Sequence, residues 1–189
     1  MWRRLRTSPG AGTNYTDRPD PRREPAAHGI GRSRGGLSTK IHSLVDGKGR
    51  PLVILIGAGH ANDSPMFGPL MASLSVPRHG PGRPRTRPDA VLADKAYSAR
   101  AHRAHLRARR ITAVIPEPSD QIRNRRRRGR IGGRPVDFDA DLYRGRNVIE
   151  RAFNRFKDWR AIATRYDKHA VNWRGGVCLA AILIWLRTT

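Results

Sequence analysis

Two of the 15 acidic residues stand at positions that suit a chemical role. Asp94 interrupts an apolar segment, residues 90–97, where a carboxylate must be paired, hydrogen-bonded or bound to a metal ion. Glu150 lies in a long helical pattern, four residues after Arg146. Each has a plainer interpretation: Asp94 at a strand end beside Lys95, and Glu150 in a surface ion pair with Arg146, contributing about 0.3–0.5 kcal/mol. Taken singly, the plainer interpretations are favoured.

Together the two carboxylates predict metal-dependent chemistry on a phosphodiester. A strand acid and a helix acid can hold hard divalent cations, Mg²⁺ or Mn²⁺, which activate the attacking oxygen and stabilise the leaving oxygen. Arg146 and Lys157 are then expected to contact phosphate, and Tyr143 to position the DNA backbone. Such a site normally needs a third acid. On one helix, four polar residues fall within a stripe of roughly 60° opposite an apolar face: Tyr143, Arg146, Glu150 and Lys157.

The overall charge indicates a polyanionic partner. The 189 residues include 38 Lys and Arg against 15 Asp and Glu, a formal net charge of +23. Cations that meet phosphates release bound counterions, so nucleic acid is the expected partner. A ribosome-type structural role and a membrane-surface role are the weaker alternatives. A run of four arginines is expected to contact DNA: Arg125, Arg126, Arg127 and Arg128.

Cysteine content and apolar runs indicate the cell compartment in which the protein is expected. The single cysteine, Cys178, excludes an internal disulfide and a cysteine-built zinc site. The basic N-terminus has no apolar core of a secretory signal. The longest apolar run, residues 177–186, is too short to cross a bilayer and is typical of a buried helix. We therefore expect a cytoplasmic, nucleoid-associated protein without a membrane segment.

Periodicity predicts an α/β chain in which a hairpin precedes βα units. Residues 1 to about 36 show no period and predict irregular chain. The expected strands are 37–45, 50–59, 90–97 and 111–116, with turn residues at 46–49. The expected helices are 66–74, 98–110, 139–159 and 170–186, with a loop over 117–137. This order indicates a mixed sheet with helices on its faces.

A basic Pro/Gly segment, residues 77–88, joins the first predicted helix to the third strand. Its Gly82-Arg83-Pro84 is similar to the core of hooks that enter the DNA minor groove. A solvated loop whose charges face phosphates without specificity is the plainer interpretation, and it is favoured.

The spacing Tyr143-(2)-Arg146-(3)-Glu150-(6)-Lys157 resembles the Y-R-E-K signature of DDE transposases of the insertion-sequence four and five groups. The segments GRSRGGLSTKIH, LADKAY, RNVIERAFNRFK and ATRYDK resemble blocks of the five-type group, in the right order over about residues 29–187. The resemblance implies an RNase H-like catalytic domain over residues 29–187. It also implies three acids that bind Mg²⁺ or Mn²⁺ for cleavage at the element's ends and joining to target DNA. Asp94 matches the second acid and Glu150 the third.

The family's first acid has no match in this sequence. It belongs to a strand block upstream of GRSRGG, whereas here Asp17 and Asp20 lie beside prolines, which are poor members of a central strand. We therefore expect an RNase H-like fold whose first strand is missing, preceded by an irregular segment, residues 1–28. The expected function is DNA cleavage and strand transfer by a truncated, defective copy, with a homodimer on DNA as one possible assembly. The alternative is a basic DNA-binding remnant that does not cut.

Overall fold

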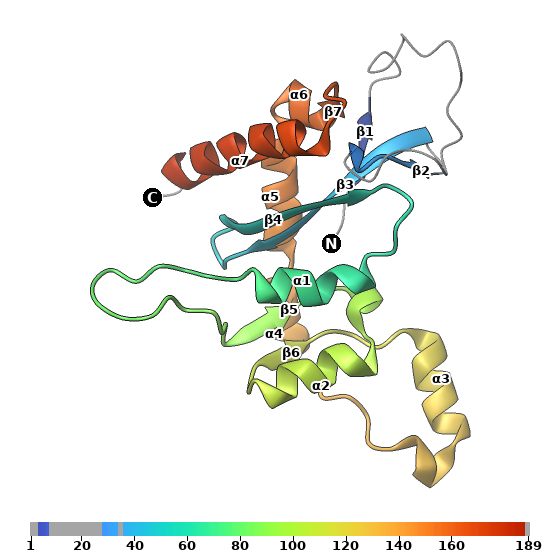
Figure 1. Cartoon of the computed structure of the whole chain (residues 1–189). Helices are drawn as coiled ribbons and strands as arrows, with labels where there is room; N and C mark the ends of the chain where they lie inside the picture. Colours follow the sequence, from blue (N-terminus) through green and yellow to red (C-terminus); the bar gives the residue numbers. More distant parts are fainter. Residues whose placement is uncertain (1–3, 8–27, 34–35, 188–189) are drawn as a thin grey trace. The chain divides into compact units, whose positions relative to one another are not determined.

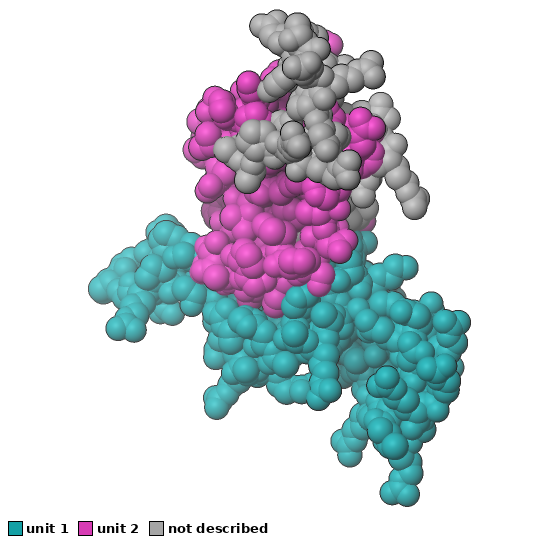
Figure 2. Space-filling model, turned by 45° about the vertical axis from the view of Figure 1, so that its right-hand side comes forward, with its two compact units in different colours: residues 1, 75–147 teal, residues 2–74, 148–189 magenta. Residues whose placement is uncertain are grey.

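The computed structural model describes residues 4–7, 28–33 and 36–187. They form a mixed α/β structure of helices and small sheets, as the periodicity predicts (Figure 1). The chain divides into two compact units (Figure 2). Unit 1 comprises Ser75–Asn147, and unit 2 combines the described parts of Trp2–Leu74 and Val148–Thr189. Each unit is described by itself below.

Unit 2 is built on an antiparallel hairpin. Strand β3 (Gly36–Val45) pairs with β4 (Pro51–Ala58), with Ile41 opposite Ile56. Gly49 closes the turn at a φ of +81°, a conformation that costs glycine least. The hairpin predicted from the alternating apolar pattern and the turn residues is therefore confirmed.

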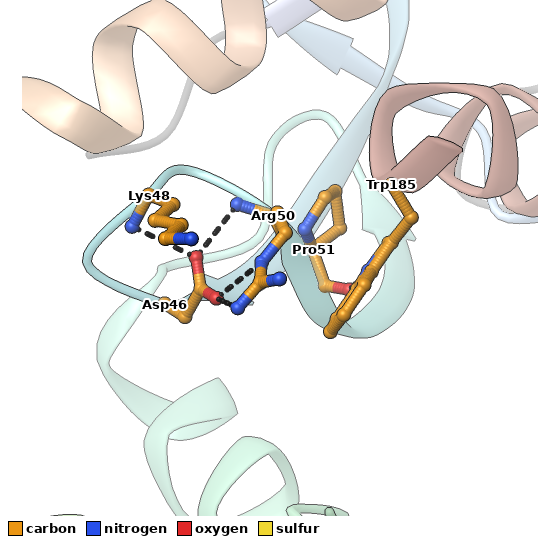
Figure 3. A network of polar contacts seen from close by, with 5 residues as sticks. All are labelled: Asp46, Lys48, Arg50, Pro51 and Trp185. Carbon is orange, nitrogen blue, oxygen red and sulfur yellow. Dashed lines mark hydrogen bonds and ion pairs between the residues drawn. The ribbon is translucent and has the colours of Figure 1, made fainter. Parts of the chain in front are cut away.

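The hairpin turn is held by one carboxylate (Figure 3). Asp46 Oδ1 accepts hydrogen bonds from the backbone N–H groups of Lys48 and Arg50, each at 2.9 Å. Its Oδ2 accepts from Arg50 Nε at 2.6 Å. The Arg50 guanidinium lies 4.3 Å from the ring centroid of Trp185, whose indole N–H donates to the Pro51 carbonyl at 2.8 Å. Burial raises the pKa of Asp46, but the hydrogen bonds from Arg50 and Lys48 outweigh it and hold the pKa below its usual value.

A short strand fills a place in the sheet where the sequence predicts none. Strand β1 (Arg4–Thr7) pairs antiparallel with β3 and parallel with β7 (Thr164–Arg165). It pairs with Ser38–Lys40 of β3, so this part of β3 is not an exposed edge of the sheet. Four residues are too few to show a period, and both partner strands are distant in sequence. Strand β2 (Gly31–Ser33) also pairs with β3, and Asp17 and Asp20 lie outside the described residues.

The core of unit 2 lies between the hairpin and two helices. Helix α5 (Asn147–Lys157) and helix α7 (Ala170–Arg187), joined through α6 (Arg160–Ala163), bring their apolar side chains to Ile41 and β4. Helix α1 (Phe67–Ala72), after a 3₁₀ turn Ser64–Met66, also contacts β3 and β4. The buried cluster consists of Ile41, Phe153, Phe156, Ile162, Trp173, Val177, Ala180, Ala181 and Ile184.

One arginine is buried inside this unit with its donors satisfied. Arg165 is 0% exposed and donates to Thr39 Oγ1 at 2.6 Å, to the Lys168 carbonyl at 2.7 Å and to the Asp167 carbonyl at 2.8 Å. Its guanidinium also lies 5.6 Å from the ring centroid of Trp173. A buried charge is tolerated only when it is hydrogen-bonded in this way. The segment ATRYDK therefore has a structural role in joining β7 to β3.

Helix α7 is apolar on two faces. By length and composition it is the one helix, within the described ranges, that is able to cross a membrane. Val177 and Ile184 nevertheless pack in the core, as a buried helix is predicted to do. The opposite side carries an exposed stripe at helical spacing: Leu179, Ile182, Leu183 and Leu186.

Unit 1 contains a small parallel βαβ arrangement. Strand β5 (Ala90–Leu92) pairs in parallel with β6 (Thr112–Val114), and helix α2 (Arg100–Ala108) connects them. These two strands form their own sheet, whereas the sequence predicts one mixed sheet. After β6 come helix α3 (Ser119–Arg127), a 3₁₀ turn Gly129–Gly132 and helix α4 (Ala140–Arg144). The buried apolar residues of this unit are Tyr97, Leu106, Ile111, Val114 and Ile115.

Three predicted elements of this region are wrong in their extent. The strand predicted over residues 90–97 ends at Leu92, because Asp94 caps the 3₁₀ turn Lys95–Tyr97. The predicted loop over 117–137 contains α3, whose strongly basic sequence shows no apolar period. The predicted helix over 139–159 is broken around Gly145 into α4 and α5. In the first and third cases the chain turns locally, at Asp94 and at Gly145, and this overrides the wider pattern.

Candidate active site

Asp94 lies directly after the carboxyl end of a parallel strand. Ala93 N–H still donates to the Val114 carbonyl, at 3.3 Å, and the chain then turns. Asp94 is the N-cap of the turn Lys95–Tyr97, and its Oδ1 accepts from Ala96 N–H at 2.9 Å. Carboxyl ends of parallel strands are where α/β proteins commonly bind ligands. Asp94 therefore has the strand-end position of the plainer interpretation. Its second carboxylate oxygen, Oδ2, accepts no hydrogen bond from the described part of the chain.

Glu150 lies in the first turn of α5, where the helix dipole favours a negative charge. The helix buries Ala152, Phe153 and Phe156 on one side, and Glu150 is half-buried rather than exposed. The apolar face predicted opposite the polar stripe is confirmed by the burial of Ala152 and Phe156, and Phe153 is buried as well.

The signature residues do not share one continuous helix. Tyr143 lies on α4, and Arg146 lies between α4 and α5. The Arg146 guanidinium stands 5.4 Å from the centroid of the Tyr143 ring, and Phe138 packs edge-on against that ring at 5.2 Å. Glu150 and Lys157 lie together on α5. The predicted stripe is thus divided at Gly145, because Gly145 is the C-cap of α4.

The donor chemistry of the two acids fits a hard divalent cation. Asp94 belongs to unit 1 and Glu150 to unit 2. Oxygen ligands of this kind are the ones that Mg²⁺ and Mn²⁺ prefer. Among the residues that the structure describes, no three His, Cys, Asp or Glu side chains form a group able to hold a metal ion.

The arginine run on α3 separates into two kinds of side chain. Arg125 is largely buried and forms a close ion pair with Glu117. Arg103 lies near the same carboxylate, and burial lowers the pKa of Arg103 despite the opposing charge of Glu117. Arg126, Arg127 and Arg128 are exposed. The run therefore has one anchoring member and three whose charges face solvent.

A buried polar group on β3 was not predicted. The alternation of residues 37–45 predicts a half-buried strand, but Lys40 and His42 are buried as well, at 5% and 0% exposure. Lys40 Nζ donates to Asp63 Oδ1 at 2.7 Å and to the Ala61 carbonyl at 2.5 Å. Burial lowers the pKa of His42 to about 4, while Asp63 raises it and Lys40 lowers it further. The alternation of residue types distinguished the two faces of the strand, but it did not predict that both faces are buried by other parts of the unit.

The family is shown by comparison with known proteins. A family model described as the transposase DDE domain matches residues 10–185. The chain belongs to the DDE transposase family. This confirms the resemblance found through the Y-R-E-K spacing and the four sequence blocks.

Two curated relatives are named after bacterial insertion sequences. A Brucella ovis protein, named as a transposase for insertion sequence element IS6501, is 34% identical over 151 residues, covering 80% of this chain and 100% of that protein. A Burkholderia cepacia protein, named as a transposase for element IS402, is 27% identical over 162 residues. That match covers 86% of this chain but 62% of the relative. No solved structure shows a significant match to the chain.

Proposed function

We propose that this chain takes part in insertion-sequence transposition as a catalytic domain that cleaves DNA and joins strands with the help of divalent metal ions. The observation that carries the proposal is the position of Asp94. It follows the carboxyl end of β5, with one carboxylate oxygen fixed by Ala96 N–H. A fixed carboxylate at this end of a parallel sheet suits metal coordination and the binding of a phosphodiester.

Asp94 and Glu150 are the proposed ligands of Mg²⁺ or Mn²⁺. A bound divalent ion supplies Lewis-acid activation of water or of a 3′-hydroxyl, and charge stabilisation at the leaving oxygen. The capping bond to Ala96 N–H restricts Asp94 to one orientation. Glu150, at the start of α5, is held by a helix whose neighbouring residues Phe153 and Phe156 are fixed in the core.

The remaining signature residues are proposed to position DNA. Tyr143 and Arg146 stack on one another, which presents a cation and a phenol from one short segment. Lys157 is the last residue of α5. Contacts of this kind hold the sugar–phosphate backbone without reading bases. Arg126, Arg127 and Arg128 are proposed to add phosphate contacts that are independent of sequence.

The alternative is a DNA-binding protein that does not cut. The sequence feature that favours it is that Asp17 and Asp20, before Gly31, lie beside prolines and do not match the first-acid block that the resemblance implies. With two carboxylates, metal affinity falls and the attacking oxygen is less well placed, and misplacement near the reacting atoms costs on the order of a hundredfold in rate. The element ends and the target site are the proposed DNA partners, a homodimer is the proposed assembly, and the bacterial nucleoid is the proposed location.

Nicking of supercoiled plasmid by the purified chain with Mn²⁺ separates the two functions. The variants are Asp94→Asn and Glu150→Gln, and Asp120→Asn is a matched control because Asp120 is an exposed acid on α3. Cleavage that both site variants abolish and the control retains supports the enzyme. Salt-sensitive DNA binding without cleavage supports the alternative, and cleavage that survives both site variants contradicts the assignment of the ligands.

A further inference from the structure

Between α1 and β5 the chain forms an exposed arm. Val76 and Arg85 exchange two backbone hydrogen bonds, of 2.9 and 2.8 Å, in an antiparallel bridge. The residues between them, 77–84, are all exposed; we call these residues the arm. The arm is the outer part of the long green loop in Figure 1, and it belongs to unit 1 (Figure 2).

The base of the arm is fixed to the body of unit 1. Arg109, at the C-cap of α2, donates from Nη2 to the Thr86 carbonyl at 2.9 Å. Arg85 donates to Asp89 Oδ1 at 2.6 Å and to the Arg87 carbonyl at 3.0 Å. Together with the bridge between Val76 and Arg85, these contacts hold the base of the loop, so the base is ordered before the arm meets a ligand. Ordering of this kind lowers the entropic cost of binding.

The tip of the arm is narrow and cationic. Gly80 and Gly82 have φ angles of +111° and +132°, which L side chains rarely adopt. A Cβ built on Gly80 would meet nothing within 4 Å, so no packing against a neighbour requires a glycine there. Arg78 and Arg83 lie on either side of residues 79–82, in which His79 and Pro81 alone carry side chains, and no acidic residue lies between Asp63 and Asp89 in the sequence. Neither guanidinium has a hydrogen bond or ion pair within the described part of the chain.

The shape of the tip suits one groove of duplex DNA. The minor groove is about 6 Å wide against about 12 Å for the major groove, so it accepts a single chain that bends at glycines but not a helix. A·T tracts narrow this groove further, and the stronger negative potential attracts inserted arginines. The exposed arginines of α3 are proposed to contact phosphates, and a helix is too wide for the minor groove. The arm and α3 therefore differ in the kind of DNA contact that they are able to make.

We propose that the arm enters the minor groove of A·T-rich duplex DNA, with the Arg83 guanidinium inserted and Arg78 on the adjoining phosphates. This inference rests on the proposed function in one respect, that duplex DNA is the partner. It adds a preference for base composition, which the carboxylates and the phosphate contacts do not supply. The recognition is by groove width and by the acceptor atoms that A·T pairs present.

The test measures binding of the full chain to two fluorescent duplexes of equal length, one with a central A·T tract and one of G·C pairs alone. The variants are Arg83→Ala and Arg83→Lys, and Arg126→Ala is the matched control from the same unit.

Arg83→Ala is expected to weaken binding to the A·T duplex about tenfold, the typical effect of one well-placed arginine, and to leave binding to the G·C duplex within about twofold of the wild type. Arg83→Lys is expected to recover part of the loss, because lysine keeps the charge but not the planar guanidinium. Arg126→Ala is expected to weaken binding to both duplexes by the same factor. Netropsin, which occupies the minor groove of A·T tracts, is expected to abolish the wild-type chain's preference for the A·T duplex.

Each other outcome overturns the inference in a recognisable way. Equal weakening on both duplexes by Arg83→Ala indicates phosphate contact without groove insertion. Wild-type binding without a preference for the A·T duplex contradicts the inference about the arm and leaves the proposed function intact. If the chain binds neither duplex, the result contradicts both the proposed function and the inference about the arm. Because Arg83 is exposed and makes no described contact, a folding defect does not account for a loss of binding.

Discussion

The two units of this chain differ in what they bury and what they display. Unit 2 buries a continuous apolar cluster of aromatic and aliphatic side chains between its hairpin and two helices. Unit 1 buries few large apolar residues, around Leu106 and Ile115, and displays arginines on α2, on α3 and on the arm. Buried apolar area is the main source of folding free energy, whereas surface cations determine the attraction for phosphate. We infer that unit 2 supplies most of the stability and that the exposed arginines of unit 1 contribute to DNA affinity.

The largest expected effect is on the core of unit 2. Phe153→Ala removes a side chain that is 1% exposed, and deletion of a buried phenyl ring costs about 3–5 kcal/mol. Denaturant unfolding followed by circular dichroism measures the change. Leu106→Ala in unit 1 is the comparison, and a destabilisation as large as that of Phe153→Ala would contradict the inferred division of stability.

The converse test removes charge from unit 1. The triple variant Arg126→Ala, Arg127→Ala and Arg128→Ala is expected to lower the slope of log affinity against log salt by about 0.9 for each phosphate that the variant no longer neutralises. Its unfolding free energy is expected to change by less than about 0.5 kcal/mol, because the three side chains are exposed. Salt titrations of DNA binding provide the measurement. An unchanged slope would remove α3 from the DNA-binding surface.

A pH effect on stability is expected from unit 2. Burial lowers the pKa of His42 to about 4 from 6.5, so the folded state holds this ring neutral while the unfolded chain takes up a proton. The associated stability is complete above pH 6.5 and is lost as the pH falls towards 4, by about 1–3 kcal/mol. Charged neighbours on the same side of the strand are Lys40 and Asp63. His42→Gln is expected to flatten the stability profile between pH 6.5 and 5, and a profile identical to the wild type would contradict this.

A smaller effect is expected where the hairpin turn meets α7. Asp46→Asn removes the charge that accepts bonds from Arg50 and Lys48, and a charge-assisted hydrogen bond contributes about 1.5–3 kcal/mol at most. Because the site is partly open to solvent, we expect a destabilisation of about 1 kcal/mol. The difference in unfolding free energy between the wild type and Asp46→Asn should decrease as the pH falls below the usual carboxyl range, since folding lowers the pKa of Asp46. Parallel melts at about pH 7 and about pH 3 measure this difference.

The smallest effect on stability is expected at the outer face of α7. Leu183→Lys changes an exposed residue, so the unfolding free energy should move by less than about 0.5 kcal/mol. The exposed stripe favours self-association, and the substitution is expected to lower the sedimenting aggregate at a given protein concentration. Aggregation equal to that of the wild type would show that this face of unit 2 is not the one responsible.

The sequence by itself determined a good part of this protein. Alternation over residues 37–45, the apolar run over 50–59 and the turn residues Asp46 and Gly49 predicted the hairpin, because side-chain period and turn chemistry act between near neighbours. The spacing from Tyr143 to Lys157 identified the family, since a signature of fixed intervals needs no tertiary contact to be recognised.

Only the tertiary structure decided the rest. The break at Gly145 and the capping of the turn after β5 by Asp94 are local features that a wider period hides. The helix within the arginine-rich segment has no apolar period that would predict it. The burial of Arg165 against Thr39, and the pairing of β1 with strands far along the chain, depend on residues brought together from distant positions. A periodic pattern states which face of an element is apolar, but the partner that covers this face is chosen by packing across the whole fold.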